Sequence, residues 1–558
     1  MAQTSALPPH RWRGADALVR SLQAAGVRVV FTLSGNHIMS VYDALLGSGI
    51  ELVHTRHEAA AVHMADAWAR LTGEVGVALV TGGPGHANAV GALYTARMAE
   101  SPVLLLSGHA PLSQLGQGAF QEMRQAALAE PLTKAAWVCR AADQLPGDLA
   151  RAVQLARSGR PGPVHLSLPS DALELQTPQQ PPPEASAFAP VPQPLAADAA
   201  QTLLAALQRA QRPLILVGPA SWDRAGRARC AALQAACGVP VIGMESPRGL
   251  ADPSLGALAE LLPRCDTVLL LGKPLDFTLK FGRAPGWTAD TAWLQVDAEL
   301  EELTRAQRNI GASLRFSAHA DTRSAIDSLT ALAQAQPAAA RPQRAAWGQG
   351  VQQAIDYRPP AWVEAVSGQA DRLHPAQALR PLQAVLDSHP DAVFIADGGE
   401  IGQWAQACLQ APHRLINGVA GAIGASLPMA LAARRAVPGA PVIAVMGDGT
   451  FGFHMAEIDT AVRCGLPLVA VVGNDARWNA EHQIQLKDYG AQRLIGCELR
   501  ATRYDLVCAA LGGHGELVTE PGQLMPAVQR ALASGLPACV NVQISSVAAP
   551  QIRRPAPA

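Results

Sequence analysis

The chain has 558 residues, more than one hydrophobic core usually organises, and this length predicts about three domains. Hydrophobic residues make up 49% of the chain and charged residues 16%, which is typical of a globular protein. The 44 basic and 45 acidic residues nearly cancel, so we expect no nucleic-acid partner. No apolar run approaches the ~20 residues that cross a bilayer, and the N-terminus shows no secretory signal pattern. We therefore expect no membrane association and a cytoplasmic location.

Short apolar runs alternate with helix-like stretches along the chain, which predicts parallel strands buried on both faces. The runs lie at 29–33, 76–80, 102–106, 213–217, 240–242, 267–271, 392–395, 442–446 and 468–472. Stretches rich in Pro, Ala and Gln at 177–194 and 334–342 predict extended linkers. We therefore predict an α/β fold of three doubly wound parallel-sheet domains, at residues 1–175, 195–333 and 345–545.

Polar or glycine-rich segments follow several predicted strands, which is where ligands bind in doubly wound sheets. Those in the first domain are Gly35-Asn36-His37-Ile38, residues 55–61 around Glu58, and Thr81-Gly82-Gly83-Pro84-Gly85. Those in the last domain are Asp397-Gly398-Gly399-Glu400, residues 418–428, Gly447-Asp448-Gly449-Thr450-Phe451-Gly452 and Asn474-Asp475. These segments are the candidates for a binding site.

The segment 447–452 is open to three interpretations. A strand-ending Asp-Gly can be a turn or a helix cap. The spacing also satisfies the dinucleotide fingerprint, with Asp475 as the ribose-binding acid. In that interpretation Asp448 would face a pyrophosphate, which is costly unless a cation lies between the two charges. Mg²⁺ commonly takes one or two carboxylates together with phosphate oxygens, so Asp448 and the Asn474 amide oxygen could supply two ligands.

The G-D-G segment, followed by Asn474 after about one β-α-β unit, resembles the diphosphate and Mg²⁺ signature of thiamine diphosphate enzymes. Residues 55–61 and 81–85 resemble the pyrimidine-binding domain of the acetolactate synthase group. The resemblance covers essentially the whole chain, in the order pyrimidine-binding, middle and diphosphate-binding domain. Within the superfamily the chain is similar to benzaldehyde lyase and to 2-hydroxyacyl-CoA lyase-like, acetolactate synthase-like proteins.

This resemblance implies thiamine diphosphate and Mg²⁺ as cofactors. It implies that Mg²⁺ is bound by Asp448, Asn474 and the main-chain carbonyl of Ala476. The residues that it places against the organic cofactor are Glu58, Gly85, Gly399, Glu400, Gly421, Ile423, Gly447, Asp448, Gly449, Thr450 and Asn474. Ile423 would be the wedge between the two cofactor rings, and Glu58 would contact the aminopyrimidine ring so that the thiazolium can be deprotonated. Taken alone, Glu58 could also be a first-turn glutamate favoured by the helix dipole.

Two further residues are candidates for the substrate pocket. His37 lies where benzaldehyde lyase-like enzymes carry an active-site histidine, although a lone histidine is often a hydrogen-bonded structural residue. Phe120-Gln121-Glu122 resembles the F-Q-E segment of the acetolactate synthase group, and Gln121 could donate a hydrogen bond to a substrate oxygen. The family pattern often continues with an acid, whereas this chain has Arg124-Gln125. This departure weakens the inference of the substrate from the family.

The function implied by the resemblance is a carbon–carbon lyase or carboligase that acts on small acyloins or 2-hydroxyacyl compounds through an enamine intermediate. The alternatives are an acetolactate synthase, an NAD-linked dehydrogenase and a cofactor-binding protein without activity. The middle domain binds FAD or a nucleotide in some relatives, but no glycine-rich fingerprint is visible here, so we expect neither FAD nor ADP. The resemblance also implies a homodimer or homotetramer with active sites at the subunit interface.

Overall fold

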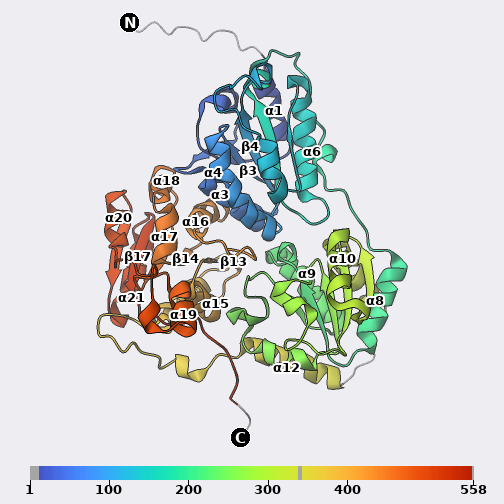
Figure 1. The fold of residues 1–558 in the computed structure, drawn as a ribbon, viewed down its shortest axis with the longest axis vertical. Coiled ribbons are helices and arrows are strands. Elements are labelled where there is room, and N and C mark those ends of the chain that lie inside the picture. The colour runs from blue at the N-terminus through green and yellow to red at the C-terminus, as the bar shows by residue number, and fades with distance from the viewer. Residues whose placement is uncertain (1–11, 337–341, 556–558) are drawn as a thin grey trace. The chain divides into compact units, whose positions relative to one another are not determined.

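The computed structural model describes residues 12–336 and 342–555 (Figure 1). Residues 1–11, where we expected no secretory signal, therefore lie outside the described residues. So do residues 337–341 of the second expected linker. The chain divides into two compact units. The first extends to Val191 apart from the short segments 70–72 and 98–100, and the second comprises these segments and the chain from Pro192 onward.

The first unit contains one sheet of six parallel strands in the order β2-β1-β3-β4-β6-β5. The strands are β1 (Val29–Thr32), β2 (Glu51–His54), β3 (Gly76–Val80), β4 (Val103–His109), β5 (Ala135–Val138) and β6 (Val164–Pro169). The flanking helices are α1 (Gly14–Ala24), α2 (Met39–Leu45), α3 (Glu58–Thr72), α4 (Pro84–Met98), α5 (Gln125–Ala129), α6 (Leu145–Arg157) and α7 (Ser170–Glu174).

The second unit contains two parallel sheets. The five-stranded sheet has the order β11-β10-β9-β7-β8 and the six-stranded sheet the order β13-β12-β14-β15-β17-β16. The strands of the five-stranded sheet are β7 (Pro213–Val217), β8 (Val241–Gly243), β9 (Thr267–Leu271), β10 (Ala292–Asp297) and β11 (Leu314–His319). Those of the six-stranded sheet are β12 (Val393–Ala396), β13 (His413–Ile416), β14 (Val442–Gly447), β15 (Val469–Asn474), β16 (His514–Val518) and β17 (Ala538–Gln543).

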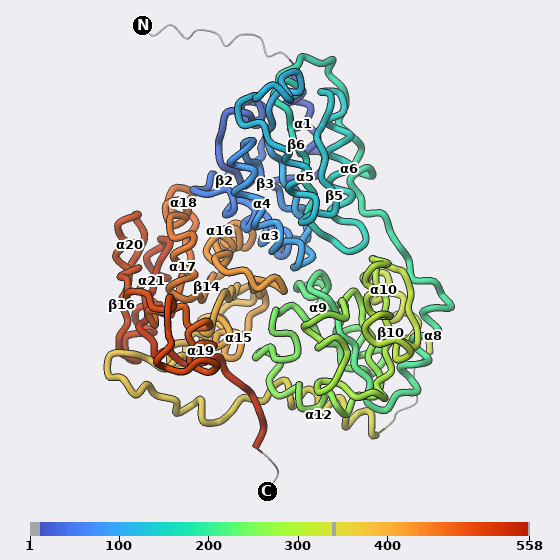
Figure 2. Tube along the Cα trace, viewed as in Figure 1, coloured from blue at the N-terminus to red at the C-terminus, as the bar shows by residue number. Residues whose placement is uncertain are grey.

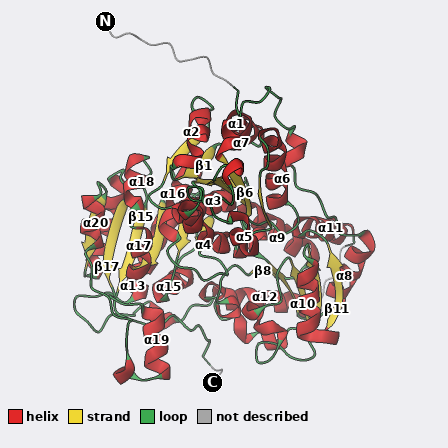
Figure 3. Ribbon diagram, turned by 45° about the horizontal axis from the view of Figure 1, so that its top comes forward, coloured by secondary structure: helices red, strands yellow, loops and turns green. Residues whose placement is uncertain are grey.

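Helices flank both sheets of the second unit, as the colouring by secondary structure shows (Figure 3). With the five-stranded sheet belong α8 (Ala197–Arg209), α9 (Arg224–Cys237), α10 (Leu300–Ile310), α11 (Thr322–Ala335) and α12 (Pro342–Asp356). The remaining helices are α13 (Pro375–Leu379), α14 (Gln383–Asp387), α15 (Glu400–Cys408), α16 (Ser426–Ala436), α17 (Asp448–His454), α18 (Glu457–Arg463), α19 (Asn479–Asp488), α20 (Tyr504–Ala510) and α21 (Pro521–Ala533).

These three sheets confirm the predicted α/β class, and every apolar run expected to be a strand is one. The central strands β3, β7 and β9 are buried along their whole length because helices cover both faces of each sheet. Within the described part of the chain, no helix is both long and apolar enough to cross a membrane.

The prediction that residues 177–194 form an extended linker is wrong in part, because this stretch contains a short helix. Residues Ala185–Phe188 form a short 3-10 helix, and Phe188 is 3% exposed within the hydrophobic core of the first unit. Burying one aromatic side chain stabilises the folded state enough to fix this turn among the prolines. The compact first unit therefore includes most of that stretch.

The order of the strands places the expected sites. In a doubly wound sheet, ligands bind where the chain reverses its direction of winding, beyond the carboxyl ends of the strands. In the first sheet this point lies between β1 and β3, which precede His37 and Thr81 respectively. In the last sheet it lies between β12 and β14, which precede Asp397 and Asp448; β14 is labelled in Figure 2.

Candidate functional site

Glu58 is the first residue of α3 and is only 7% exposed. The helix begins here because the His57 ring nitrogen accepts a hydrogen bond from the main-chain N–H of Ala59. The Asn88 amide on α4 donates to the Glu58 Oε2 atom at 3.0 Å. A Cβ added to Gly85 would lie 3.2 Å from the other carboxylate oxygen, so glycine leaves the space beside Glu58 free. The carboxylate is thus held in one orientation with one oxygen available.

His37 lies in a 3-10 turn directly after β1 and is 4% exposed. Its Nδ1 atom is 3.3 Å from the Thr81 hydroxyl, and its ring stacks on Phe120 with the ring centres 5.9 Å apart. Burial lowers the pKa of His37 below its ordinary value, and the nearby His109 lowers it further. At neutral pH the imidazole is therefore uncharged and can accept a proton.

Gln121 follows Phe120 with a left-handed backbone conformation, at a φ of 57°. This conformation costs a residue with a side chain roughly 1–2 kcal/mol. Such strain is concentrated at functional sites. The Gln121 Oε1 atom is buried and has no hydrogen-bond partner among the described residues. The first unit thus brings together His37, Thr81 and Gln121, and separately Glu58, Gly85 and Asn88.

Two carboxylates approach one another at the carboxyl end of the last sheet. Asp448 is 2% exposed and Asp475 is 6% exposed, and both line the same cavity. Burial raises the pKa of Asp448 to about 6, against the effect of neighbouring main-chain N–H groups. Burial also raises the pKa of Asp475 to about 7, and the charge of Asp448 raises it further. The Asp448 Oδ2 atom has no partner among the described residues, so the pair is suited to binding a cation.

The two other expected metal ligands are engaged elsewhere. The Asn474 amide donates to the Thr502 carbonyl and to the Asn541 side chain, while its oxygen accepts from the main-chain N–H of Ala476. The Ala476 carbonyl accepts a hydrogen bond from Leu499 at 2.7 Å. Neither residue lines the cavity that holds Asp448. The structure brings Asp475, rather than Asn474, to the side of Asp448.

The remaining residues expected to bind the cofactor surround this cavity. Gly399, Glu400, Ile423, Gly447, Asp448, Gly449 and Thr450 all line it. Gly421 lies in the turn just before Ile423, with a φ of 66°. The buried Asp397 carboxylate fixes this turn, because its Oδ2 atom accepts from the main-chain N–H groups of Gly424 and Ser426. Asp397 therefore positions the segment that carries Ile423.

Trp478 forms part of the wall of the same cavity. A Cβ added to Gly449 would lie 2.4 Å from the Trp478 ring, so any larger residue at position 449 would displace the indole. The ring also packs edge-on against Phe453, with the ring centres 6.2 Å apart. His482, four residues after Trp478 in the chain, is buried but is not among the residues that line this cavity.

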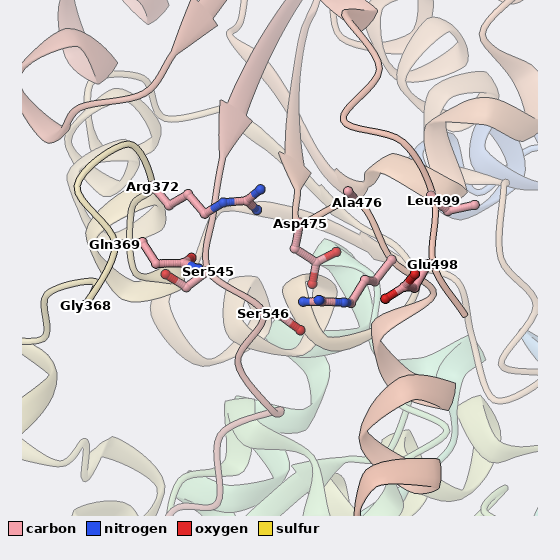
Figure 4. Close-up of a pocket in the computed structure, with 10 residues that line it drawn as sticks. Gly368, Gln369, Arg372, Asp475, Ala476, Glu498, Leu499, Ser545 and Ser546 are labelled. Carbon is pink, nitrogen blue, oxygen red and sulfur yellow. The ribbon is translucent and has the colours of Figure 1, made fainter. Parts of the chain in front are cut away.

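A second cavity of about 510 Å³ adjoins the first, because Asp475, Arg477 and Ser545 line both. It is polar, and the side chains of Asp475 and Arg372 both extend toward it (Figure 4). The Arg372 guanidinium is anchored by donating to the Ile544 carbonyl at 3.0 Å. The Asp475 carboxylate thus lies where the two cavities meet.

The middle sheet has its own winding reversal, between β7 and β9, where the loops that follow these two strands approach each other closely. A Cβ added to Gly218 would lie 2.4 Å from the Gly272 carbonyl, so the two loops are in direct contact. The Lys273 side chain is 1% exposed and forms an ion pair with Asp276 at 3.2 Å. This end of the middle sheet therefore has close main-chain contacts and an ion pair in which the Lys273 side chain is buried.

Four residues of the site were not predicted from the sequence in these positions: Asn88, Thr81 as the partner of His37, Asp397 in its positioning role, and Asp475 beside Asp448. Asn88 lies one helical turn after Gly85 on the same helix, which is a spacing that could have indicated it. Thr81 and Asp397 belong to segments that the sequence had singled out, but their partners are distant in the chain.

Comparison with known proteins matches both site-bearing regions to one family. Residues 12–128 match the description "Thiamine pyrophosphate enzyme, N-terminal TPP binding domain", and residues 397–542 match "Thiamine pyrophosphate enzyme, C-terminal TPP binding domain". The chain is 33% identical over 548 residues to a probable acetolactate synthase of Mycobacterium bovis, with 97% of each chain covered.

Two other relatives carry different names. The chain is 31% identical over 585 residues to 2-hydroxyacyl-CoA lyase 2 of Homo sapiens, covering 95% of this chain and 90% of that one. It is 29% identical over 556 residues to a sulfoacetaldehyde acetyltransferase of Castellaniella defragrans, covering 93% and 90% respectively. Since identity above 30% extends over almost the full length, the chain belongs to the thiamine pyrophosphate enzyme family, within the superfamily of acetolactate synthase-like enzymes.

Proposed function

We propose that this thiamine diphosphate enzyme is a Mg²⁺-dependent carbon–carbon lyase or carboligase for acyloins or 2-hydroxyacyl compounds. The observation that carries the proposal is the buried, uncharged His37 beside Phe120-Gln121 at the carboxyl end of the first sheet. A 2-hydroxyacyl substrate must lose its hydroxyl proton as the bond breaks, and an uncharged imidazole can accept it. Family membership favours this proposal over the dinucleotide interpretation of residues 447–452.

The residues of the last sheet fit a cation and a diphosphate. We propose that Asp448 and Asp475 bind Mg²⁺, because their desolvated carboxylates face one cavity and one oxygen has no other partner among the described residues. Asn474, the ligand expected from the sequence, would then fix the end of β15 through its hydrogen bonds to Thr502 and Asn541. Diphosphate oxygens, water and main-chain carbonyls would complete the octahedron.

Bound thiamine diphosphate supplies a nucleophilic carbon and accepts the electrons of the broken carbon–carbon bond. The chain supplies orientation and proton transfer. Glu58, fixed by Asn88, holds the proton that the aminopyrimidine ring exchanges. His37 takes the hydroxyl proton of the substrate, and Gln121 donates a hydrogen bond to the oxygen on which charge develops. We further propose that the middle domain is structural and binds neither FAD nor ADP, because its sequence has no glycine-rich fingerprint.

Acetolactate synthase activity is the second candidate, favoured by the name of the Mycobacterium bovis relative. The two candidates differ in what the first step requires. A 2-oxo acid loses CO₂ and needs no base for a hydroxyl proton at that step, whereas an acyloin does. The histidine therefore distinguishes them.

Replacing His37 with alanine should slow cleavage of benzoin or of a 2-hydroxyacyl-CoA by about 10²-fold or more, the effect expected for a lost general base. In the wild type, the rate should fall as the pH decreases through the pKa of His37, which lies below its ordinary value of ~6.5. Steady-state rates between pH 5 and 8 measure both effects.

Exchange of the thiazolium proton provides the control, since it depends on Glu58 and should change little in His37→Ala. If the wild type converts pyruvate to acetolactate and does not act on either 2-hydroxy substrate, acetolactate synthesis replaces the lyase proposal.

The resemblance implies that Glu58 and Asp448 of different subunits form one site, and we propose a homodimer or homotetramer on that ground. Inactive Glu58→Gln and inactive Asp448→Ala chains, mixed under exchange conditions, should then recover about a quarter of the wild-type activity. Half of randomly mixed dimers are hybrids, and each hybrid has one intact site. Absence of recovery, with subunit exchange shown by mass spectrometry, would place each site within a single chain.

A further inference from the structure

The side chain of Gln125 joins the ends of three strands in the first unit. Gln125 is the first residue of α5, at the end of the loop that carries Gln121, and it is 1% exposed. Its Oε1 atom accepts from the main-chain N–H of Gly83 at 2.9 Å. Its Nε2 atom donates to the Gly108 carbonyl at 3.0 Å and to the Ser167 hydroxyl at 3.2 Å. Both amide N–H groups and the oxygen are therefore used, which is the full donor capacity of this side chain.

The groups that Gln125 binds lie directly against the proposed substrate residues. A Cβ added to Gly83 would lie 2.7 Å from the Cβ of Gln121, so the two main chains are packed together. A Cβ added to Gly108 would lie 2.6 Å from the Cβ of His37. A shift of either glycine by a fraction of an ångström would therefore be transmitted to Gln121 or His37.

The main chain of Gln125 is fixed as well. Its carbonyl accepts a hydrogen bond from His86 Nε2 at 3.1 Å, and the other nitrogen of that imidazole is 2.9 Å from the Ser107 hydroxyl. His86 lies one residue after Gly85 in the first turn of α4. The network thus connects α4, β6 and α5 (labelled in Figure 2) with β4 (labelled in Figure 1), without including any residue placed in contact with substrate or cofactor.

We infer that Gln125 is a positioning residue, which holds Gln121 and His37 in place through Gly83 and Gly108. This inference rests on the proposed roles of Gln121 and His37. Gln121 has a left-handed backbone and no partner for its buried side-chain oxygen among the described residues, so no hydrogen bond of that oxygen holds the conformation. The hydrogen bonds of Gln125 supply the constraint from the neighbouring loop.

The test is a double-mutant cycle with Gln121→Ala and Gln125→Met, in which methionine keeps the length of the side chain and removes its hydrogen bonds. Gln125→Met alone should lower kcat for the donor substrate by 10-fold to 10²-fold, the effect of a displacement of up to ~1 Å. In the Gln121→Ala background the same change should lower kcat by a smaller factor than in the wild type, because only the effect that Gln125 exerts through His37 then remains.

Multiplicative effects of the two mutations, or an unchanged kcat in either single mutant, would overturn the inference. If Gln125→Met fails to fold, Ser167→Ala removes one of the three hydrogen bonds and takes its place in the same cycle. The cycle uses whichever donor the wild type turns over, benzoin or pyruvate. Failure of the lyase proposal therefore appears in the wild-type substrate profile, and failure of the positioning role appears in the cycle.

Discussion

Replacing Glu58 with glutamine is expected to remove nearly all turnover. We expect kcat to fall by about 10²-fold to 10⁴-fold, the range typical of general acid–base catalysis. Glutamine keeps the shape of the side chain and can still pair with Asn88, so folding should be nearly unchanged. It cannot exchange a proton with the aminopyrimidine ring as a carboxyl group does. The decisive measurement is the exchange rate of the thiazolium proton, which should fall in parallel with turnover.

Glu130→Gln is the matched control, because Glu130 is an exposed glutamate in the same unit. It should retain wild-type exchange and turnover. Asn88→Ala tests the orientation of the carboxylate, and it should reduce the exchange rate by less than Glu58→Gln does. Turnover by Glu58→Gln at the wild-type rate would remove the assigned role of this carboxylate.

Changes to the two carboxylates of the last sheet are expected to have the second largest effect. Asp448→Ala should abolish measurable Mg²⁺-dependent binding of thiamine diphosphate, because the cavity loses the carboxylate oxygen that has no other partner among the described residues. Asp475→Ala should weaken binding by about 10²-fold or more, beyond the 10–100-fold typical of residues outside the coordination shell. Isothermal titration with the diphosphate in the presence of Mg²⁺ measures these affinities.

Asp475→Asn separates the role of the oxygen from the role of the charge. An amide oxygen is still a ligand for Mg²⁺, so this variant should bind far better than Asp475→Ala. The exposed Asp488 provides the control, and Asp488→Ala should bind as the wild type does. If Asn474→Ala loses more affinity than Asp475→Ala while both remain folded, the amide is the ligand and our assignment of Asp475 is wrong. Full activity after treatment with a chelator would contradict the metal requirement itself.

The sequence predicted the central strands well but predicted few of the edge strands. β5 is only half-buried, and β11 alternates between half-buried and exposed residues, so neither forms an uninterrupted apolar run. β6 and β17 are buried but contain His165 and Asn541, whose polar side chains interrupt the pattern. Periodicity identifies a strand by its apolar residues. It therefore fails where a strand is at an edge or carries a buried polar group.

The candidate site was predicted where a motif and a strand end coincide. Glu58 and Asp448 lie at the carboxyl ends of strands, and each is found facing a cavity or a glycine-lined space. The choice between Asn474 and Asp475 could not be made from the sequence, because both residues are good oxygen ligands at the end of one strand. The partners Thr502 and Asn541, which turn Asn474 away from the cavity, are 28 and 67 residues distant.

The adjacency of Asn474 and Asp475 limits which insertions and deletions β15 can tolerate. Successive side chains of a strand point to opposite faces, and here one faces the Thr502 loop while the other faces Asp448. Deleting one residue from β15 would exchange the amide and the carboxylate, leaving a negative charge among buried carbonyls. Deleting or adding two residues would preserve both orientations. Changes of length within β15 are therefore tolerated only in even steps, unless a bulge absorbs the difference, whereas the helices and loops between Asp448 and the start of β15 carry no such constraint.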